Sequence, residues 1–272
     1  MVGAVSLLRP FQGKSMPKAV HLNFEEYGQP SLPDLLIIHG FFASSRNWRL
    51  IAKKLAEHYH VYVLDMRNHG ESPHVPAMDY PEMSADIELF LNMHNIESAH
   101  FIGHSMGGKA VMWFALHHAA RINRQVIVDI SPVSYRHSFD NLISALQALP
   151  LEQLTNRKQA DDLLSNSIPE LSFRQFLLQN LVLKEGKYHW RIDLSIFAKT
   201  ADNIIAFPEV EALQAYTRDT LFLGGEMSDY VIEESVYAFF PNAQIKIIPG
   251  AGHWIHAQQP EAFLQAVYGF LS

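Results

Sequence analysis

A glycine-rich segment in the first half of the chain contains a residue suited to covalent chemistry. Residues 103–107 read Gly-His-Ser-Met-Gly and fit the pattern G-x-S-x-G, with Ser105 at the centre. An apolar run precedes the pattern and a helical pattern follows it, so Ser105 is expected on a tight turn from a strand into a helix. Such a turn exposes the hydroxyl, a weak nucleophile by itself, to a neighbouring base. The segment therefore predicts that Ser105 is a catalytic nucleophile.

The base that would activate Ser105 is expected near the C-terminus. Triads built on this serine motif occur along the chain in the order serine, acid, histidine. This order selects His253 from the fifteen histidines, because it stands in a glycine-rich loop directly after the last predicted strand. His256, three residues later, is the alternative. A metal site at His253 and His256 is not expected, because the sequence offers no evident third ligand.

Two predicted strand ends offer a carboxylate that could orient His253. Asp129 stands at the end of the strand expected beside the nucleophile strand, and Asp229 follows the strand predicted at 220–223. The second location is the common one for the acid, but the position that would carry it holds Ser228. Asp229 comes one residue later, so its side chain would point in a different direction. We therefore expect Asp129 to be the acid, with Asp229 as the alternative.

Two backbone amides are candidates for stabilising negative charge in the reaction. A tetrahedral intermediate needs preorganised N–H donors where its charge develops. Met106, directly after the nucleophile, is expected to supply one amide. Phe41 is expected to supply the other, because Gly40 allows the loop after an early strand to turn that amide inward. His39 is interpreted as a residue that holds this loop by hydrogen bonds. Neither a cofactor nor a metal is expected.

Short apolar strands and longer helices alternate along most of the chain, and these elements must position the candidate residues. Runs rich in Val, Ile and Leu predict strands that are covered on both faces, at 35–39, 61–64, 100–103, 126–129, 220–223 and 244–248, with a further strand within 20–27. Helical patterns lie at 46–58, 80–95, 106–118, 232–240 and 260–271. The alternation predicts a mostly parallel sheet flanked by helices. Together with the serine motif at a turn from strand to helix, it is typical of the α/β-hydrolase fold.

The alternation stops between residues 134 and 218. This stretch contains several helical patterns and no clear strand, and it is far longer than the dozen or so residues that a crossover needs. It predicts a helical cap, inserted after the Asp129 strand into a core formed by 19–133 and 219–272. Residues 1–18 are expected to be a disordered extension. The cap residues Phe173 and Phe176 are candidates for the acyl pocket. The core residues Phe42 and Trp48 are also candidates, although an aromatic side chain packs in the core as readily.

Composition excludes several classes of protein and partner. A net charge of −7 argues against a nucleic-acid partner, which would require a basic face. No apolar run is long enough to span a bilayer. The absence of cysteine excludes disulfides and thiolate catalysis and fits a reducing compartment, so a cytoplasmic location is expected. Mitochondrial import is the alternative, because residues 1–24 contain basic but no acidic residues.

With these residues in place, the chain resembles the bacterial esterase YbfF group of α/β-hydrolases. The likeness extends from about Leu35 to the C-terminus, is weakest in the insertion, and rests on four segments: DMRNHG at 65–70, GHSMGGKA at 103–110, DISPV at 129–133 and GAGHW at 250–254. The resemblance implies a serine carboxylesterase with a helical cap that acts on small acyl esters, with acyl thioesters as a second substrate class. It implies that Ser105 is the nucleophile and His253 the base. It also favours Asp129, because members of the group are similar in having Ser at the position of Ser228.

Two other functions remain open. A C–C bond hydrolase or a lactonase would use the same three residues. A binding protein without activity is the less favoured possibility, because none of the triad residues is missing from the sequence. Epoxide hydrolases and dehalogenases of this fold would require Asp where this chain has Ser105. The sequence makes no prediction of the oligomeric state.

Overall fold

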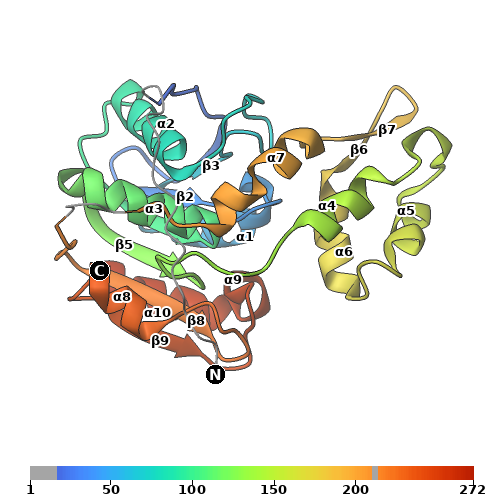
Figure 1. Cartoon of the computed structure of the whole chain (residues 1–272). Helices are drawn as coiled ribbons and strands as arrows, with labels where there is room; N and C mark the ends of the chain where they lie inside the picture. The colour runs from blue at the N-terminus through green and yellow to red at the C-terminus, as the bar shows by residue number, and fades with distance from the viewer. Residues whose placement is uncertain (1–16, 210–213) are drawn as a thin grey trace.

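The computed structural model describes residues 17–209 and 214–272 (Figure 1). The predicted N-terminal extension, residues 1–18, lies outside the described residues except for its last two. The same holds for most of residues 1–24, on which the alternative of mitochondrial import rests. Within the described ranges, none of the helices has both the length and the apolar character needed to cross a membrane.

A seven-stranded sheet forms the centre of the protein, in the order β1-β3-β2-β4-β5-β8-β9. β1 pairs antiparallel with β3, and the other neighbours in this sheet pair in parallel. The strands are β1 (Phe24–Tyr27), β2 (Asp34–Ile38), β3 (His60–Leu64), β4 (Ala99–His104), β5 (Ile122–Val128), β8 (Thr220–Gly225) and β9 (Gln244–Ile248). This arrangement confirms the predicted α/β-hydrolase fold.

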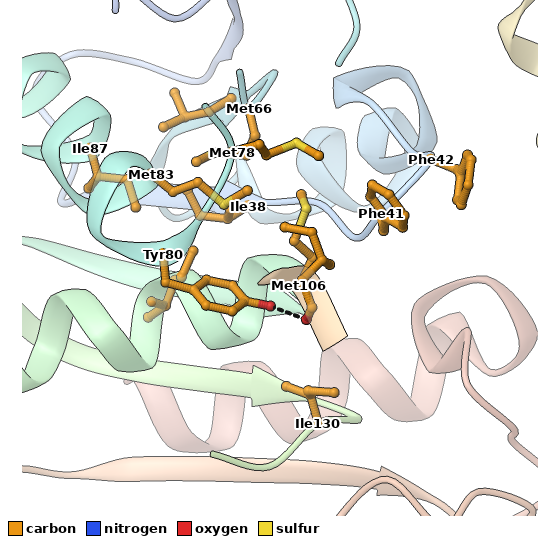
Figure 2. Packing of buried hydrophobic residues seen from close by; sticks show 14 of the residues in the cluster. Ile38, Phe41, Phe42, Met66, Met78, Tyr80, Met83, Ile87, Met106 and Ile130 are labelled. Atoms are coloured by element: carbon orange, nitrogen blue, oxygen red, sulfur yellow. Dashed lines mark hydrogen bonds between the residues drawn. The ribbon is translucent and has the colours of Figure 1, made fainter. Parts of the chain in front are cut away.

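Helices cover both faces of the sheet, so most residues of its inner strands β2, β3, β4, β5 and β8 are buried. In β2, Leu35 and Ile37 join one buried cluster with α1 and α10, whereas Leu36 and Ile38 join another with α2 and α3. Figure 2 shows part of the second cluster, around Ile38. The core helices are α1 (Arg49–Leu55), α2 (Tyr80–Met93), α3 (Met106–His117), α8 (Glu233–Phe239), α9 (Ile255–Gln258) and α10 (Pro260–Leu271), with short 3-10 turns η1 (Ser45–Trp48) and η2 (Ala119–Arg121).

Most of the segment between β5 and β8, from α4 to β7, lies beside the sheet at the right of Figure 1, and α7 leads back from it to the core. Its elements are α4 (Asp140–Gln147), η3 (Leu151–Gln153), α5 (Arg157–Leu164), α6 (Leu171–Leu177), η4 (Leu178–Asn180), β6 (Leu181–Lys184), β7 (Lys187–Trp190) and α7 (Leu194–Ile205). We call this segment the cap.

The prediction that this stretch has no strand is wrong, because β6 and β7 form an antiparallel hairpin. Glu185 and Gly186 connect the strands with φ of 52° and 78°, the two positive angles that a type I′ hairpin turn requires. Each strand has only four residues. The apolar run in β6 is three residues long, shorter than the runs in β2 and β3, and β7 has polar residues at two of its four positions.

Candidate active site

The turn between β4 and α3 holds Ser105 at the carboxyl end of the sheet. β4 ends at His104 and α3 begins at Met106, so Ser105 stands alone between them, with φ 52° and ψ −119°. This conformation lies outside the regions that L-residues favour, and it costs about 1–3 kcal/mol where the surroundings enforce it. The strand–turn–helix context predicted for Ser105 is therefore present, with the strained backbone that exposes the hydroxyl.

Two glycines allow α3 to begin close against the sheet. A Cβ on Gly107 would lie 2.3 Å from the carbonyl oxygen of Ile38 in the neighbouring strand β2. A Cβ on Gly103 would lie 2.5 Å from the carbonyl oxygen of Gly107. Because real Cβ atoms do not approach other atoms this closely, a side chain at either position would push α3 outward and displace Ser105.

The structure brings His253 and Asp129 into direct contact. The Nδ1–H of His253 donates to Oδ2 of Asp129 over 2.7 Å, and this carboxylate is fully buried whereas the imidazole is 22% exposed. Because the carboxylate accepts from Nδ1, the other ring nitrogen, Nε2, is left free to accept a proton. His253 and Ser105 line the same cavity. Asp129 and His253 are thus in contact, and Ser105 shares a cavity with His253, so the three residues that the sequence proposed for a triad lie at the same end of the sheet.

Two further donors hold the Asp129 carboxylate. The amide of Gly225 donates to Oδ1 over 3.0 Å, and the hydroxyl of Ser228 donates to Oδ2 over 2.5 Å. Asp229, the alternative acid, is exposed, and among the described residues its carboxylate makes neither a hydrogen bond nor an ion pair. Sequence reasoning treated Ser228 only as a missing carboxylate. A hydroxyl at the position where the acid commonly lies is the feature of the sequence that could have predicted the contact between Ser228 and Asp129.

The two candidate amides of the oxyanion hole find no acceptor in the part of the chain that the structure describes. Among the described residues, neither Phe41 N–H nor Met106 N–H donates a hydrogen bond. The Phe41 loop passes so close to the serine that a Cβ on Gly40 would lie 3.3 Å from the Cβ of Ser105. Two free amides beside a nucleophile are available to a negatively charged oxygen.

His39 holds the Phe41 loop in place by two hydrogen bonds of its ring. Its Nδ1–H donates to the carbonyl oxygen of Gly40 over 2.8 Å, and its Nε2 accepts from the amide of Met66 over 3.0 Å. Complete burial lowers the pKa of His39, although the charge of Asp65 opposes the effect. A neutral ring is the form that can donate on one side and accept on the other. The interpretation of His39 as a structural residue of the loop agrees with these contacts.

His256, the alternative base, is buried in packing contacts. Its ring stacks on Trp48 with 3.9 Å between centroids, and burial together with the charge of His253 lowers its pKa to about 3. His104, next to the nucleophile, donates from Nε2 to the carbonyl oxygen of His253 over 2.8 Å and so fixes that loop. Among residues 17–209 and 214–272, no group of three His, Asp or Glu side chains is arranged to hold a metal ion.

A cavity of about 500 Å³ lies over Ser105, between the core and the cap. All four predicted pocket residues line it: Phe42, Trp48, Phe173 and Phe176. The rings of Phe173 and Phe176 each lie 5.6 Å from the ring of Trp254, next to His253. The aromatic side chains of the cap therefore reach the immediate surroundings of the triad candidates.

Lys109 is an unexpected buried amine in the wall of this cavity. From helix α3, its Nζ donates to the carbonyl oxygens of Ile205, over 2.6 Å, and Ala206, over 3.0 Å, at the end of α7. Burial lowers the pKa of Lys109 well below 10.5. Lys109 therefore joins the nucleophile helix to the last turn of the cap.

The lowered pKa of Lys109 predicts a pH-dependent contribution to stability. Above the lowered pKa and below 10.5, the unfolded chain binds a proton that the folded chain has lost, so the contribution of Lys109 to stability increases with pH. We expect the unfolding free energy of the wild type to rise relative to that of Lys109→Met across this window, in urea titrations at several pH values. Lys199→Met, an exposed change on α7, is the control and should give a constant difference. A constant difference for Lys109→Met as well would mean that the buried amine stays charged.

Comparison with known proteins identifies the family. The family model described as "alpha/beta hydrolase fold" matches residues 33–260. The chain belongs to the α/β-hydrolase family.

Several relatives are similar to this protein along nearly the whole chain. The chain is 39% identical over 266 residues to the sn-1-specific diacylglycerol lipase ABHD11 of Xenopus laevis, covering 93% of this chain and 85% of the relative. It is 36% identical over 244 residues to esterase YbfF of Escherichia coli (strain K12), covering 88% of this chain and 92% of that protein. The solved structure of a marine microorganism esterase superposes with a TM-score of 0.88 at 37% identity, covering 93% of this chain and all of that one. The resemblance to the esterase YbfF group is thereby confirmed.

Proposed function

We propose that this protein is a serine carboxylesterase that hydrolyses acyl esters through an acyl-enzyme on Ser105. The observation that carries the proposal is the 2.7 Å hydrogen bond between His253 and Asp129, at the wall of the cavity that also holds Ser105. Hydrolysis of ester bonds is also the activity named in the esterase and lipase relatives.

The proposed reaction begins with proton transfer between neighbouring side chains. As the Ser105 oxygen attacks the ester carbonyl, Nε2 of His253 takes the hydroxyl proton, and the Asp129 carboxylate stabilises the resulting imidazolium through Nδ1–H. The carbonyl oxygen becomes an oxyanion that accepts from the amides of Phe41 and Met106. Loss of one such donor typically costs about 3 kcal/mol of transition-state stabilisation.

The second half of the proposed reaction releases both products. The tetrahedral intermediate collapses, the bond to the alcohol breaks, and His253 returns its proton to the leaving oxygen. Water then attacks the acyl-enzyme with His253 again as base, so that the acid leaves and the Ser105 hydroxyl is restored. This chemistry consumes one water and needs no further reactant.

A substrate panel tests the proposal against its alternatives. Purified protein is incubated with acyl p-nitrophenyl esters, acyl-CoA thioesters, lactones and an sn-1,2-diacylglycerol, the last because one relative is named for it. We expect the esters to be hydrolysed and Ser105 to be labelled by a fluorophosphonate. A clear preference for lactones would favour the lactonase alternative. Absence of both turnover and labelling would favour a non-catalytic binding protein. The cytoplasmic location expected from the sequence stays a prediction, which cell fractionation would test.

The cap aromatics are expected to set the preferred acyl-chain length. Phe173→Ala and Phe176→Ala each enlarge the cavity near Trp254, so we expect the optimum in kcat/KM to move to longer chains across acetyl to dodecanoyl esters. Each methylene accommodated in an apolar pocket is worth roughly 1–3 kcal/mol. Leu183→Ala, which truncates an exposed cap side chain outside the cavity, is the matched control. An unchanged optimum in both phenylalanine variants would leave Phe42 and Trp48 as the acyl-binding wall.

A further inference from the structure

A second cavity, of about 220 Å³, lies next to the first, between the core and the cap. Phe42, Asn47 and Gln179 line both cavities, so the two cavities share part of their walls. Asn47 Nδ2 donates to Oε1 of Gln179 over 2.7 Å, which joins η1 of the core to η4 of the cap at this boundary. A molecule with its reacting carbonyl at Ser105 could therefore extend past this boundary into the second cavity.

Three arginines line the second cavity, although the chain as a whole carries a net charge of −7. Arg46 belongs to η1, Arg157 is the first residue of α5, and Arg191 follows β7. The carboxylate of Glu71 lies 3.4 Å from the guanidinium of Arg46 and 3.5 Å from that of Arg191, and Glu71 is 60% exposed. One largely exposed carboxylate is thus shared by two of the three guanidinium groups.

The other nearby carboxylate is engaged elsewhere. Asp65 accepts from the amides of Ser45 and Glu71 and from the side chain of Asn23. Burial and the charges of Arg46 and Arg157 lower the pKa of Arg191, although Glu71 and Asp65 oppose the shift. The cluster is therefore short of negative charge.

The arginines also have unused hydrogen-bond donors. Within the described residues, the guanidinium of Arg191 makes the ion pair with Glu71 and no hydrogen bond, although it is only 14% exposed. Arg157 uses one terminal nitrogen, which donates to the carbonyl oxygen of Leu181 over 2.6 Å. A guanidinium has five N–H donors in a fixed plane that matches the oxygens of phosphate.

We propose that the second cavity is a phosphate-binding site in which Arg157 and Arg191 hold the phosphate of a phosphomonoester, with Arg46 at its exposed side. A tetrahedral dianion offers enough oxygens to meet three converging guanidinium groups. Because the site adjoins the acyl cavity, we infer that the phosphate is carried by the alcohol part of the ester substrate. This last step rests on the proposed esterase function, whereas phosphate binding itself does not.

Binding of inorganic phosphate tests the site independently of catalysis. Isothermal titration calorimetry at constant ionic strength compares the wild type with Arg191→Gln, Arg157→Gln and the control Lys187→Gln, which removes an exposed charge from the hairpin that directly precedes Arg191. We expect Arg191→Gln and Arg157→Gln each to raise the Kd about tenfold or more, because a charge-assisted hydrogen bond is lost. Lys187→Gln should match the wild type. Circular dichroism checks folding, and two independent arginine variants guard against a misfolded one.

Selectivity between two matched esters tests where the phosphate comes from. The ratio of kcat/KM for 1-butyrylglycerol 3-phosphate to that for 1-butyrylglycerol should fall about tenfold in Arg191→Gln and stay constant in Lys187→Gln. Phosphate binding with an unchanged ratio would support the site and assign it to a free phosphate ligand. Failure of the wild type to bind phosphate, together with an unchanged ratio, would overturn the proposal. Failure to hydrolyse either ester would reject the esterase function but leave the calorimetric result standing.

Discussion

Replacing Ser105 with alanine should lower kcat for ester hydrolysis by more than about 10⁴-fold, because removal of the nucleophile from a serine triad leaves only binding and oxyanion stabilisation. Alanine keeps the Cβ, so the backbone strain at φ 52° stays the same as with serine. We therefore expect the fold and the thermal stability to change little. The measurement is the hydrolysis of p-nitrophenyl butyrate together with labelling by a fluorophosphonate, which should disappear.

Ser172→Ala is the control for this experiment. Ser172 also lines the cavity over Ser105, but it is an exposed residue of the cap helix α6 and stands on no strained turn. Its loss should leave both turnover and labelling intact. If Ser105→Ala kept more than about a hundredth of the wild-type kcat, Ser105 could not be the nucleophile.

Asp129→Asn should lower kcat by about 10⁴-fold, the size of effect expected when the group that orients a triad histidine is neutralised. The native carboxylate accepts three hydrogen bonds, from His253, Gly225 and Ser228. An asparagine side chain has one accepting oxygen and one donating nitrogen. At least one of the three donors would then face an N–H group, and His253 would lose the tautomer with a free Nε2.

Asp229→Asn provides the comparison, because it makes the same chemical change one residue after Ser228, the position where the acid commonly lies. Asp229 is exposed, so we expect its kcat to stay within about twofold of the wild type. Both variants should be assayed with an ester at saturating concentration, after their folding has been checked by circular dichroism. The opposite ranking of the two variants would assign the acid to Asp229.

The core of the fold was predictable because its signals are local. The run at 244–248 was expected as a strand and is β9, and α10 has the predicted bounds, with Pro260 in its first turn and a buried face that includes Phe263 and Val267. The helix expected at 46–58 is shorter in the structure, since η1 takes its first turn and α1 ends at Leu55. Apolar periodicity identifies such elements but marks their ends poorly when a 3-10 turn continues the same pattern.

The parts of the site that were missed depend on contacts between distant segments. The helical pattern around Lys109 does not indicate that its side chain is buried. The carbonyl groups that accept from Lys109 lie at the end of α7, almost a hundred residues later in the chain. The arginines of the second cavity come from three elements separated along the chain, and no spacing rule connects them. The triad candidates could be predicted because the carboxyl ends of parallel strands lie at one edge of the sheet, so topology alone places these residues together.

The strained backbone of Ser105 also bears on how such a protein can evolve. A domain of this kind is typically stable by only about 5–15 kcal/mol, and the conformation at Ser105 takes about 1–3 kcal/mol of that margin. Selection for stability alone would favour glycine at this position, since glycine adopts positive φ without penalty. The serine persists only where reactivity is selected, and the close approach of Gly103 and Gly107 leaves few neighbouring substitutions that could relax the turn. Stabilising mutations are therefore expected to accumulate at a distance from the turn, in the sheet and its covering helices.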